Sequence, residues 1–216
     1  MERLKKILDR IFIDGLSAMA QGLFATLIIG TIIQQIGTLV GGPAGDMIYA
    51  LGKVAASLTG AGIGAAVAYR FKEGPLVVVS AATAGMVGAF ASKLLAGAVL
   101  VDGAMVYAGP GEPLGAFIAA YVGIIFGHLV SGKTKVDILV TPIVAIGTGS
   151  AVGLVLGPPI SGFMAWLGSL INWGTEQQPF LMGIVVSVLM GMILTLPISS
   201  AAIGIILNLS GLAAGA

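Results

Sequence analysis

Residues 172–216 read NWGTEQQPFLMGIVVSVLMGMILTLPISSAAIGIILNLSGLAAGA, and this stretch decides the class of fold. A polar entry at 176–178 is followed by seventeen uncharged residues, 179–195. At the rise of an α-helix, a run of that length covers roughly 25 Å, which is enough to cross the core of a bilayer. The stretch therefore predicts a transmembrane helix.

A break follows this helix at 196–200, Leu-Pro-Ile-Ser-Ser, before a second uncharged run begins. An uncharged break is tolerated at membrane depth only where it is buried in protein or faces a polar cavity. Broken helices of this kind form substrate sites near the bilayer midplane of transporters. We therefore expect a binding site here, with the candidates Thr195, Ser199, Ser200 and Asn208. The alternative is that these groups only make hydrogen bonds between helices.

The composition places the chain in a membrane. It is 57% hydrophobic and 9% charged, with a mean hydropathy of +1.09, whereas a soluble domain has about 25% charged residues. The 34 glycines indicate tightly packed helices. The absence of cysteine excludes a disulfide and a thiolate nucleophile, and the single histidine excludes a multi-histidine metal site. A net charge of +1 gives no reason to expect a nucleic-acid partner.

The ~20-residue length of a membrane span predicts an all-α, polytopic protein with six to seven transmembrane helices. Six spans are readable, at 15–40, 47–69, 75–100, 113–131, 137–156 and 179–196, with a seventh apolar run at 198–216. Residues 157–172 begin with a double proline at 158–159, and we expect a short re-entrant or interfacial helix there. The whole chain, 1–216, is one transmembrane domain, with a basic lead at 1–14, three spans in 15–112 and the remaining spans in 113–216.

Basic residues alternate from loop to loop. They precede the first span and occupy the loops after the second and fourth spans: Arg3, Lys5, Lys6, Arg10, Arg70, Lys72, Lys133 and Lys135. The other loops carry only acidic charge, from Asp46, Asp102, Glu112 and Glu176. By the positive-inside rule, the N-terminus is cytoplasmic and the chain is a multi-pass membrane protein.

Small residues recur at every fourth position in each predicted span, as at Gly52, Ala56, Gly60 and Gly64. Such rows let helix backbones approach closely in lipid. The first span also resembles the fourth, and the third resembles the sixth. This similarity favours a 3+3 inverted repeat, a plan found in many transporters. The alternative is chance similarity, which is common in a chain rich in glycine and isoleucine.

The remaining candidate residues are polar groups within or at the ends of spans. Lys53 and Lys93 either extend their ammonium groups to the interface or line a substrate path, and we include Lys93 among the site candidates. Glu176, Gln177 and Gln178 suit the hydroxyls of a sugar, or they form an ordinary helix start. Thr141, beside Pro142, marks a kinked polar region in the fifth span.

No catalytic motif is present. The chain has no Ser-His-Asp set, no H-E-x-x-H and no P-loop, so we expect neither an enzyme nor a cofactor or metal. His128 lies beside basic Lys133, and a structural role is expected for it.

The stretch from Glu176 to Ala202, EQQPFLMGIVVSVLMGMILTLPISSAA, resembles the membrane-embedded IIC subunit of bacterial phosphotransferase-system sugar permeases, in the branch with the perfringolysin regulator-like proteins. IFIDGLSAMAQGLFATLIIGTIIQQIG near the N-terminus and VDILVTPIVAIGTGSAVG at 136–153 resemble the same branch. The resemblance implies that this chain is the N-terminal two-thirds of such a protein.

The resemblance also implies the function. A sugar-like polar solute would cross the bacterial inner membrane through a subunit that is often a homodimer and works with separate cytoplasmic phosphotransferase components. The alternative, which the same branch implies, is a membrane-embedded sensor or regulator without transport.

Overall fold

The computed structural model describes residues 9–188 except 99, 102, 103, 108, 178, 179, 182 and 186. In chain order the elements are η1 (Arg10–Gly15), α2 (Leu16–Leu23), η2 (Phe24–Ile28), α3 (Ile29–Val40), α4 (Gly42–Ser57), α5 (Thr59–Arg70), α6 (Pro75–Ala89), α7 (Ala91–Leu95), β1 (Leu100–Val101), β2 (Ala104–Met105), α8 (Pro113–Val130) and α9 (Asp137–Gln177). The two η elements are π-helical: η1 precedes α2, and η2 joins α2 to α3, so that 10–40 form one helical segment. β1 and β2 form a short antiparallel ribbon.

Among the described residues, three helical segments are long and apolar enough to cross a membrane, namely Arg10–Val40, Pro113–Val130 and Asp137–Trp166. The pair α4 and α5 makes a fourth if a helix bent by 51° is counted as one span. The all-helical membrane fold is therefore confirmed. The predicted six to seven spans are not confirmed. Five of them were expected within 15–156, where the described residues give three or four, and 189–216 lie outside the described residues.

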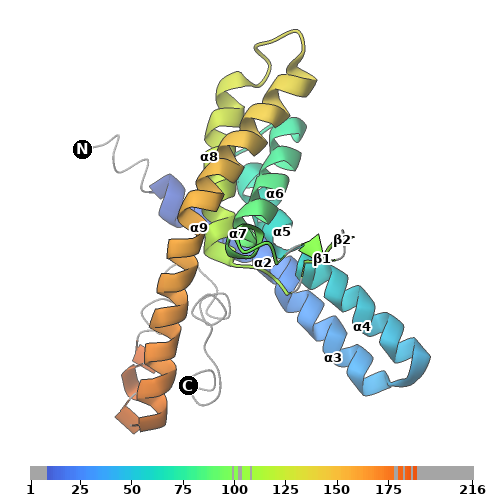
Figure 1. The fold of residues 1–216 in the computed structure, drawn as a ribbon, viewed down its shortest axis with the longest axis vertical. Helices are drawn as coiled ribbons and strands as arrows, with labels where there is room; N and C mark the ends of the chain where they lie inside the picture. Colours follow the sequence, from blue (N-terminus) through green and yellow to red (C-terminus); the bar gives the residue numbers. More distant parts are fainter. Residues whose placement is uncertain are drawn as a thin grey trace.

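The helices form a bundle from which two parts project (Figure 1). The bundle contains α5, α6, α8 and the first half of α9, and α2 packs against α5. α3 and α4 pair with each other and extend away from the bundle as a hairpin, which we call the arm (29–57). The second half of α9 extends from the bundle in another direction.

Small residues hold these helices together, as the fourfold rows predict. A Cβ added to Gly22 would lie 2.5 Å from the carbonyl oxygen of Gly62, and one on Gly149 would lie 2.5 Å from that of Ala119. A real Cβ does not approach an oxygen so closely, so these positions require glycine. Contact between backbones is the usual way in which helices associate in lipid.

The arm begins where two hydroxyl groups meet. Thr59 is fully buried, and its hydroxyl donates a hydrogen bond of 2.7 Å to the carbonyl of Ala56. The Thr26 hydroxyl donates to Gly22 and lies 3.5 Å from that of Thr59. The bend between α4 and α5 at Leu58 therefore lies opposite the π-helical turn η2 on the partner helix. Both helices of the hairpin are irregular at the same level.

Two predicted elements need correction. The third span was expected to run over 75–100, but α6 ends at Ala89 and is followed by α7 and the β ribbon. A separate re-entrant helix was expected at 157–172. Instead, α9 continues through Pro158 and Pro159 without interruption.

Candidate functional site

A change of direction at the end of α6 places the first polar groups of the site. The chain turns at Phe90, with φ −108° and ψ 15°, and enters α7. Ser92 and Lys93 lie on that short helix. The Lys93 ammonium is 5.5 Å from the centre of the Phe90 ring, a distance at which a cation–π attraction acts. This predicted candidate therefore lies beyond the end of a shortened helix and not within a continuous span.

Glu112 lies in the loop before α8 and caps that helix. Its carboxylate accepts hydrogen bonds from the backbone N–H groups of Leu114 (3.2 Å) and Gly115 (2.5 Å). A negative charge at this position is also stabilised by the helix dipole. Burial raises the pKa of the Glu112 carboxyl, while the hydrogen bonds from Gly115 and Leu114 act to lower it. The carboxyl is thus partly buried and held in a fixed orientation.

The loop before α8 is pressed against the end of α6. The Glu112 N–H donates a hydrogen bond of 2.8 Å to the carbonyl of Ala89. Gly111 has φ +74°, and a Cβ there would lie 2.7 Å from the Ala89 Cβ. Both the backbone conformation and the close contact require glycine at this position.

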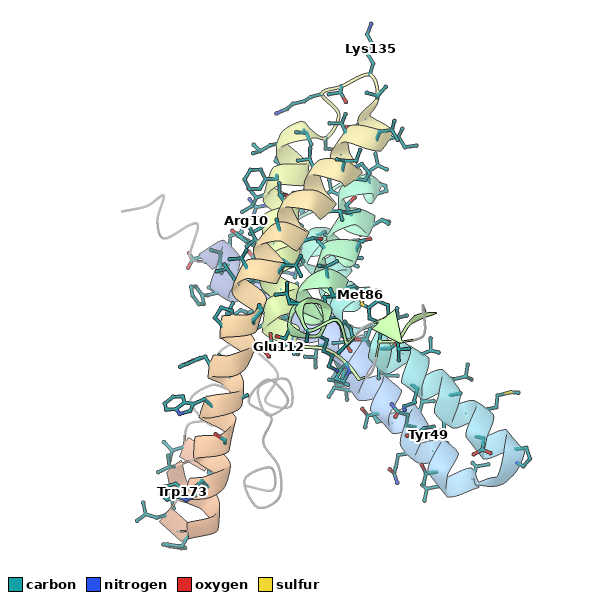
Figure 2. All side chains as sticks on the ribbon, viewed as in Figure 1. Arg10, Tyr49, Met86, Glu112, Lys135 and Trp173 are labelled. Carbon is teal, nitrogen blue, oxygen red and sulfur yellow. The ribbon has the colours of Figure 1, made fainter. Side chains whose placement is uncertain are left out.

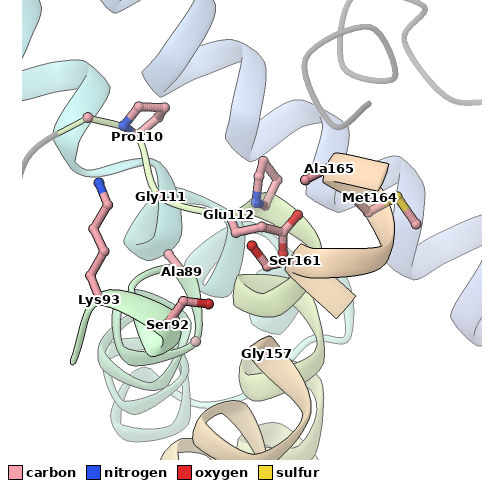
Figure 3. Close-up of a pocket in the computed structure, with 13 residues that line it drawn as sticks. Ala89, Ser92, Lys93, Pro110, Gly111, Glu112, Gly157, Ser161, Met164 and Ala165 are labelled. Atoms are coloured by element: carbon pink, nitrogen blue, oxygen red, sulfur yellow. The ribbon is translucent and has the colours of Figure 1, made fainter. Parts of the chain in front are cut away.

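α9 closes the other side of the site. A Cβ on Gly157 would lie 2.7 Å from that of Ala91, so α9 passes directly over the beginning of α7. One turn further along α9, Ser161 faces the loop that carries Glu112 (Figure 3).

A cavity of about 320 Å³ lies between these elements. Its polar side chains are Ser92, Lys93, Glu112 and Ser161, and the rest of its wall is largely glycine, alanine and proline. Figure 3 shows Glu112 and Ser161 on one side, with Lys93 on the other. Small-molecule sites typically have about 300–1,000 Å³ and a few convergent polar groups in a mainly apolar wall. This cavity has a suitable size and chemistry for a small polar molecule.

The predicted candidate Thr141 lies elsewhere. It is fully buried in the first turns of α9, and its hydroxyl donates a hydrogen bond of 2.6 Å to Asp137. The same carboxylate oxygen accepts from the N–H of Gly132. The structure therefore does not bring Thr141 together with Lys93.

The other predicted candidates cannot be placed. Glu176 and Gln177 are in the last turn of α9, but their side chains are not among the described ones. The remaining candidates lie outside the described residues: Gln178, Thr195, Ser199, Ser200 and Asn208. The break at 196–200 also lies outside them, so the site expected there stays a prediction.

A second polar cluster joins the start of the chain to the loop before α6. Glu73 has a side chain that is only 5% exposed, and it lies 2.9 Å from the His128 ring and 3.9 Å from the Arg10 guanidinium. Next to it, Arg70 makes an ion pair of 2.8 Å with Asp14. The charged groups of this cluster pair with one another. His128 therefore has a structural contact, in line with the expectation from the sequence.

Sequence reasoning missed Glu112, Ser92 and Ser161 as members of a common site. Glu112 entered that reasoning only as the charge of a loop. Its position immediately before Pro113 and an apolar run was the available signal, because an acidic residue followed by proline is typical of a helix start. The serines had no signal, since only the folded chain brings α7 next to α9.

In the described part of the chain, no group of three His, Cys, Asp or Glu residues is arranged to hold a metal ion.

The family model described as "Phosphotransferase system, EIIC" matches residues 13–216. Neither the curated proteins nor the solved structures include a match to this chain.

Proposed function

We infer the function from one premise: the chain belongs to the phosphotransferase system EIIC family, whose model matches nearly all of it. It is a membrane component of that system. We propose that it moves a sugar or a similar small polar solute across the bacterial inner membrane, and that the cavity between α7, α8 and α9 receives this solute.

The main support for this proposal is the chemistry of the cavity. Sugar hydroxyls both donate and accept hydrogen bonds, and the cavity offers a carboxylate at Glu112, an ammonium at Lys93 and hydroxyls at Ser92 and Ser161. An apolar helical bundle that holds these groups in one place has the features expected of a polar-solute site.

The distribution of charge supports an outward-facing cavity. Arg70 ends α5 and Lys72 follows it, and Lys133 and Lys135 follow α8. The cavity lies at the end of α6 and the start of α8, which are the helix ends opposite these basic residues. By the positive-inside rule the basic ends are cytoplasmic, so the cavity faces the outside and the N-terminus is cytoplasmic.

We also propose the remaining features of the transporter from sequence and family. These are further spans at 179–196 and 198–216, an inverted repeat of three spans, a homodimer, and separate cytoplasmic phosphotransferase components as partners. Counting the predicted spans, the loops would alternate between the two sides of the membrane as the basic residues do.

Uptake into vesicles tests the proposal. The complete natural protein, reconstituted in lipid vesicles with its phosphotransferase partners, should accumulate at least one labelled sugar or sugar alcohol. Glu112→Gln and Ser161→Ala should reduce this uptake. Ser169→Ala is the matched control, because Ser169 lies on α9 outside the cavity and its hydroxyl bonds to the carbonyl of Trp166.

Two outcomes would count against the proposal. Equal loss of uptake in the Ser161 and Ser169 variants would show that the cavity is not part of the solute path. Absence of uptake across a broad sugar panel, together with specific binding of a cytoplasmic protein, would favour the sensor or regulator instead.

A further inference from the structure

The arm formed by α3 and α4 carries two rows of polar side chains. On α3 they are Thr31, Gln35 and Thr38, and on α4 they are Asp46, Lys53 and Ser57. Members of each row are separated by three, four or seven residues, so each row follows one side of its helix. Apart from the partly buried Ser57, all of these residues are exposed.

Both rows lie on the same face of the arm. The helices touch through glycines, where a Cβ on Gly37 would lie 2.7 Å from the carbonyl of Gly45 and one on Gly30 would lie 2.8 Å from that of Gly52. The polar rows include the residue that directly follows each of these four glycines. One residue turns a helix by about 100°. The residue after a contact glycine therefore points about 100° away from the partner helix. Because the two helices are antiparallel, this rotation brings such residues of both helices to the same side of the pair.

The side of the arm opposite the polar face is apolar. Its large exposed side chains are Ile29, Ile32, Ile36, Met47 and Leu51. Such a surface suits lipid tails, whereas the polar face (Thr31, Gln35, Thr38, Asp46, Lys53 and Ser57) does not. The arm is therefore amphipathic although its helices have the apolar character of membrane segments.

Within the described residues, the polar face has unused hydrogen-bonding capacity. The hydroxyls of Thr31, Thr38 and Ser57 donate to carbonyls of their own helices, which leaves their oxygens free to accept. In the described part of the chain, Asp46 and Lys53 make no ion pair, and the Lys53 ammonium lies 5.7 Å from the centre of the Tyr49 ring. A lysine facing the lipid core costs about 3 kcal/mol or more, so water or protein must cover this face.

A second copy of the chain does not satisfy Lys53. Copies in one membrane share their orientation, so a two-fold axis runs along the membrane normal and brings residues of equal depth together. Asp46, the acidic residue of the face, is seven residues from Lys53, or about 10 Å along the helix. A symmetric contact through this face would bury Lys53 without an acidic partner, which is strongly unfavourable.

We propose that the polar face of the arm lines a water-filled path for a hydroxyl-rich solute, continuous with the cavity at Glu112. The chain that continues from the arm packs against the wall of that cavity, since Gly60 in α5 lies just beyond the bend and a Cβ on it would lie 2.8 Å from the Cβ of Ala89, a cavity residue. Acceptor oxygens, the Gln35 amide and the Lys53 ammonium together match the donors and acceptors of sugar hydroxyls. This inference rests on the proposed function.

Single cysteines test the path, because the native chain contains none. Neighbouring residues form matched pairs at nearly equal depth: Thr31→Cys with Ile32→Cys, Gln35→Cys with Ile36→Cys, and Thr38→Cys with Leu39→Cys. The complete protein in membrane vesicles is treated with a water-soluble methanethiosulfonate reagent. Because only a hydrated thiolate reacts, each polar-face cysteine should react at least about tenfold faster than its neighbour. Glucose or mannitol at millimolar concentration should slow the labelling at Gln35→Cys.

Three results would overturn the proposal. Equal rates within the pairs would show that water does not reach the polar face. Disulfide-linked dimers of Gln35→Cys would show that a second copy covers it. Labelling that no sugar or sugar alcohol slows would show that water reaches this face but that the solute does not pass along it. Labelling does not depend on uptake, so its failure and the failure of the transport assay are distinguishable.

Discussion

At the residue scale, Glu112 is the group on which the site depends most. Its carboxylate caps α8, its N–H fixes the loop to α6, and its side chain enters the wall of the cavity. It thereby connects α6, the loop before α8 and α8 itself. Its protonation state should therefore influence both stability and solute binding.

The Glu112 carboxyl predicts a pH dependence of stability. Burial raises its pKa in the folded protein above the ordinary 4.5, so between these two values the folded state binds more protons than the unfolded state. The contribution to stability is then fully present below pH 4.5 and is lost as the pH rises through the folded-state pKa. Glu112→Gln should remove this dependence.

The measurement is the melting temperature of the detergent-solubilised protein against pH, for the native chain and Glu112→Gln side by side. The difference between the two curves isolates Glu112 from other titrating groups. A difference that does not change with pH would show that burial does not affect this carboxyl.

Gly111 and Gly109 give a second residue-scale prediction. Both have positive φ, so alanine at either position is strained by roughly 1–2 kcal/mol. A Cβ at Gly111 would also collide with Ala89, whereas a Cβ at Gly109 has nothing within 4 Å. Gly111→Ala should therefore lower the melting temperature more than Gly109→Ala. Equal effects would contradict the close contact between the loop and α6.

At the element scale, the sequence predicts some features well and others poorly. The fourfold rows correctly predict that helices meet through Gly22, Gly30 and Gly149. Hydropathy does not detect the end of α6 at Ala89, because the residues that follow remain apolar. The double proline at 158–159 predicts a break, yet α9 continues there.

The bend between α4 and α5 also has no obvious signal in the sequence, because Ser57, Leu58 and Thr59 contain neither proline nor glycine. The structure supplies a physical reason. The hydroxyls of Ser57 and Thr59 donate to carbonyls three residues back, at Val54 and Ala56. Such bonds compete with the regular helix ladder and often bend helices. The candidate cavity escaped prediction for a related reason, since it depends on where α6 ends.

Two glycines on α9 test the packing of helices directly. A Cβ at Gly149 would meet the carbonyl of Ala119 at 2.5 Å and the Cβ of Ala84 at 2.8 Å, whereas one at Gly147 has nothing within 4 Å. Gly149→Ala should destabilise the protein by about 1–3 kcal/mol through overpacking. Gly147→Ala should be neutral or stabilising by up to about 1 kcal/mol, because alanine favours a helix. Melting temperatures that fall equally would contradict this packing of α9 on α6 and α8.

At the scale of the whole molecule, the chain combines a tightly packed bundle with the arm and the projecting half of α9 (Figure 2). The bundle is fixed through glycine contacts and, near Arg10, through the Glu73 cluster. Further polar groups line the cavity and one face of the arm. In the function that we propose, the bundle is the rigid part and the solute binds at its junction with the two projections.

The central claim is that the cavity between α7, α8 and α9 opens to the outside of the cell and receives the solute. Ser161→Cys places a thiol in its wall, and Thr134→Cys places one between α8 and α9 at the opposite side of the membrane. In intact cells that produce the complete protein, an impermeant thiol reagent should label Ser161→Cys, and the transported solute should slow this labelling. Thr134→Cys should react only after the cells are permeabilised. Labelling of Ser161→Cys only after permeabilisation, or labelling that the transported solute does not slow, would contradict the claim.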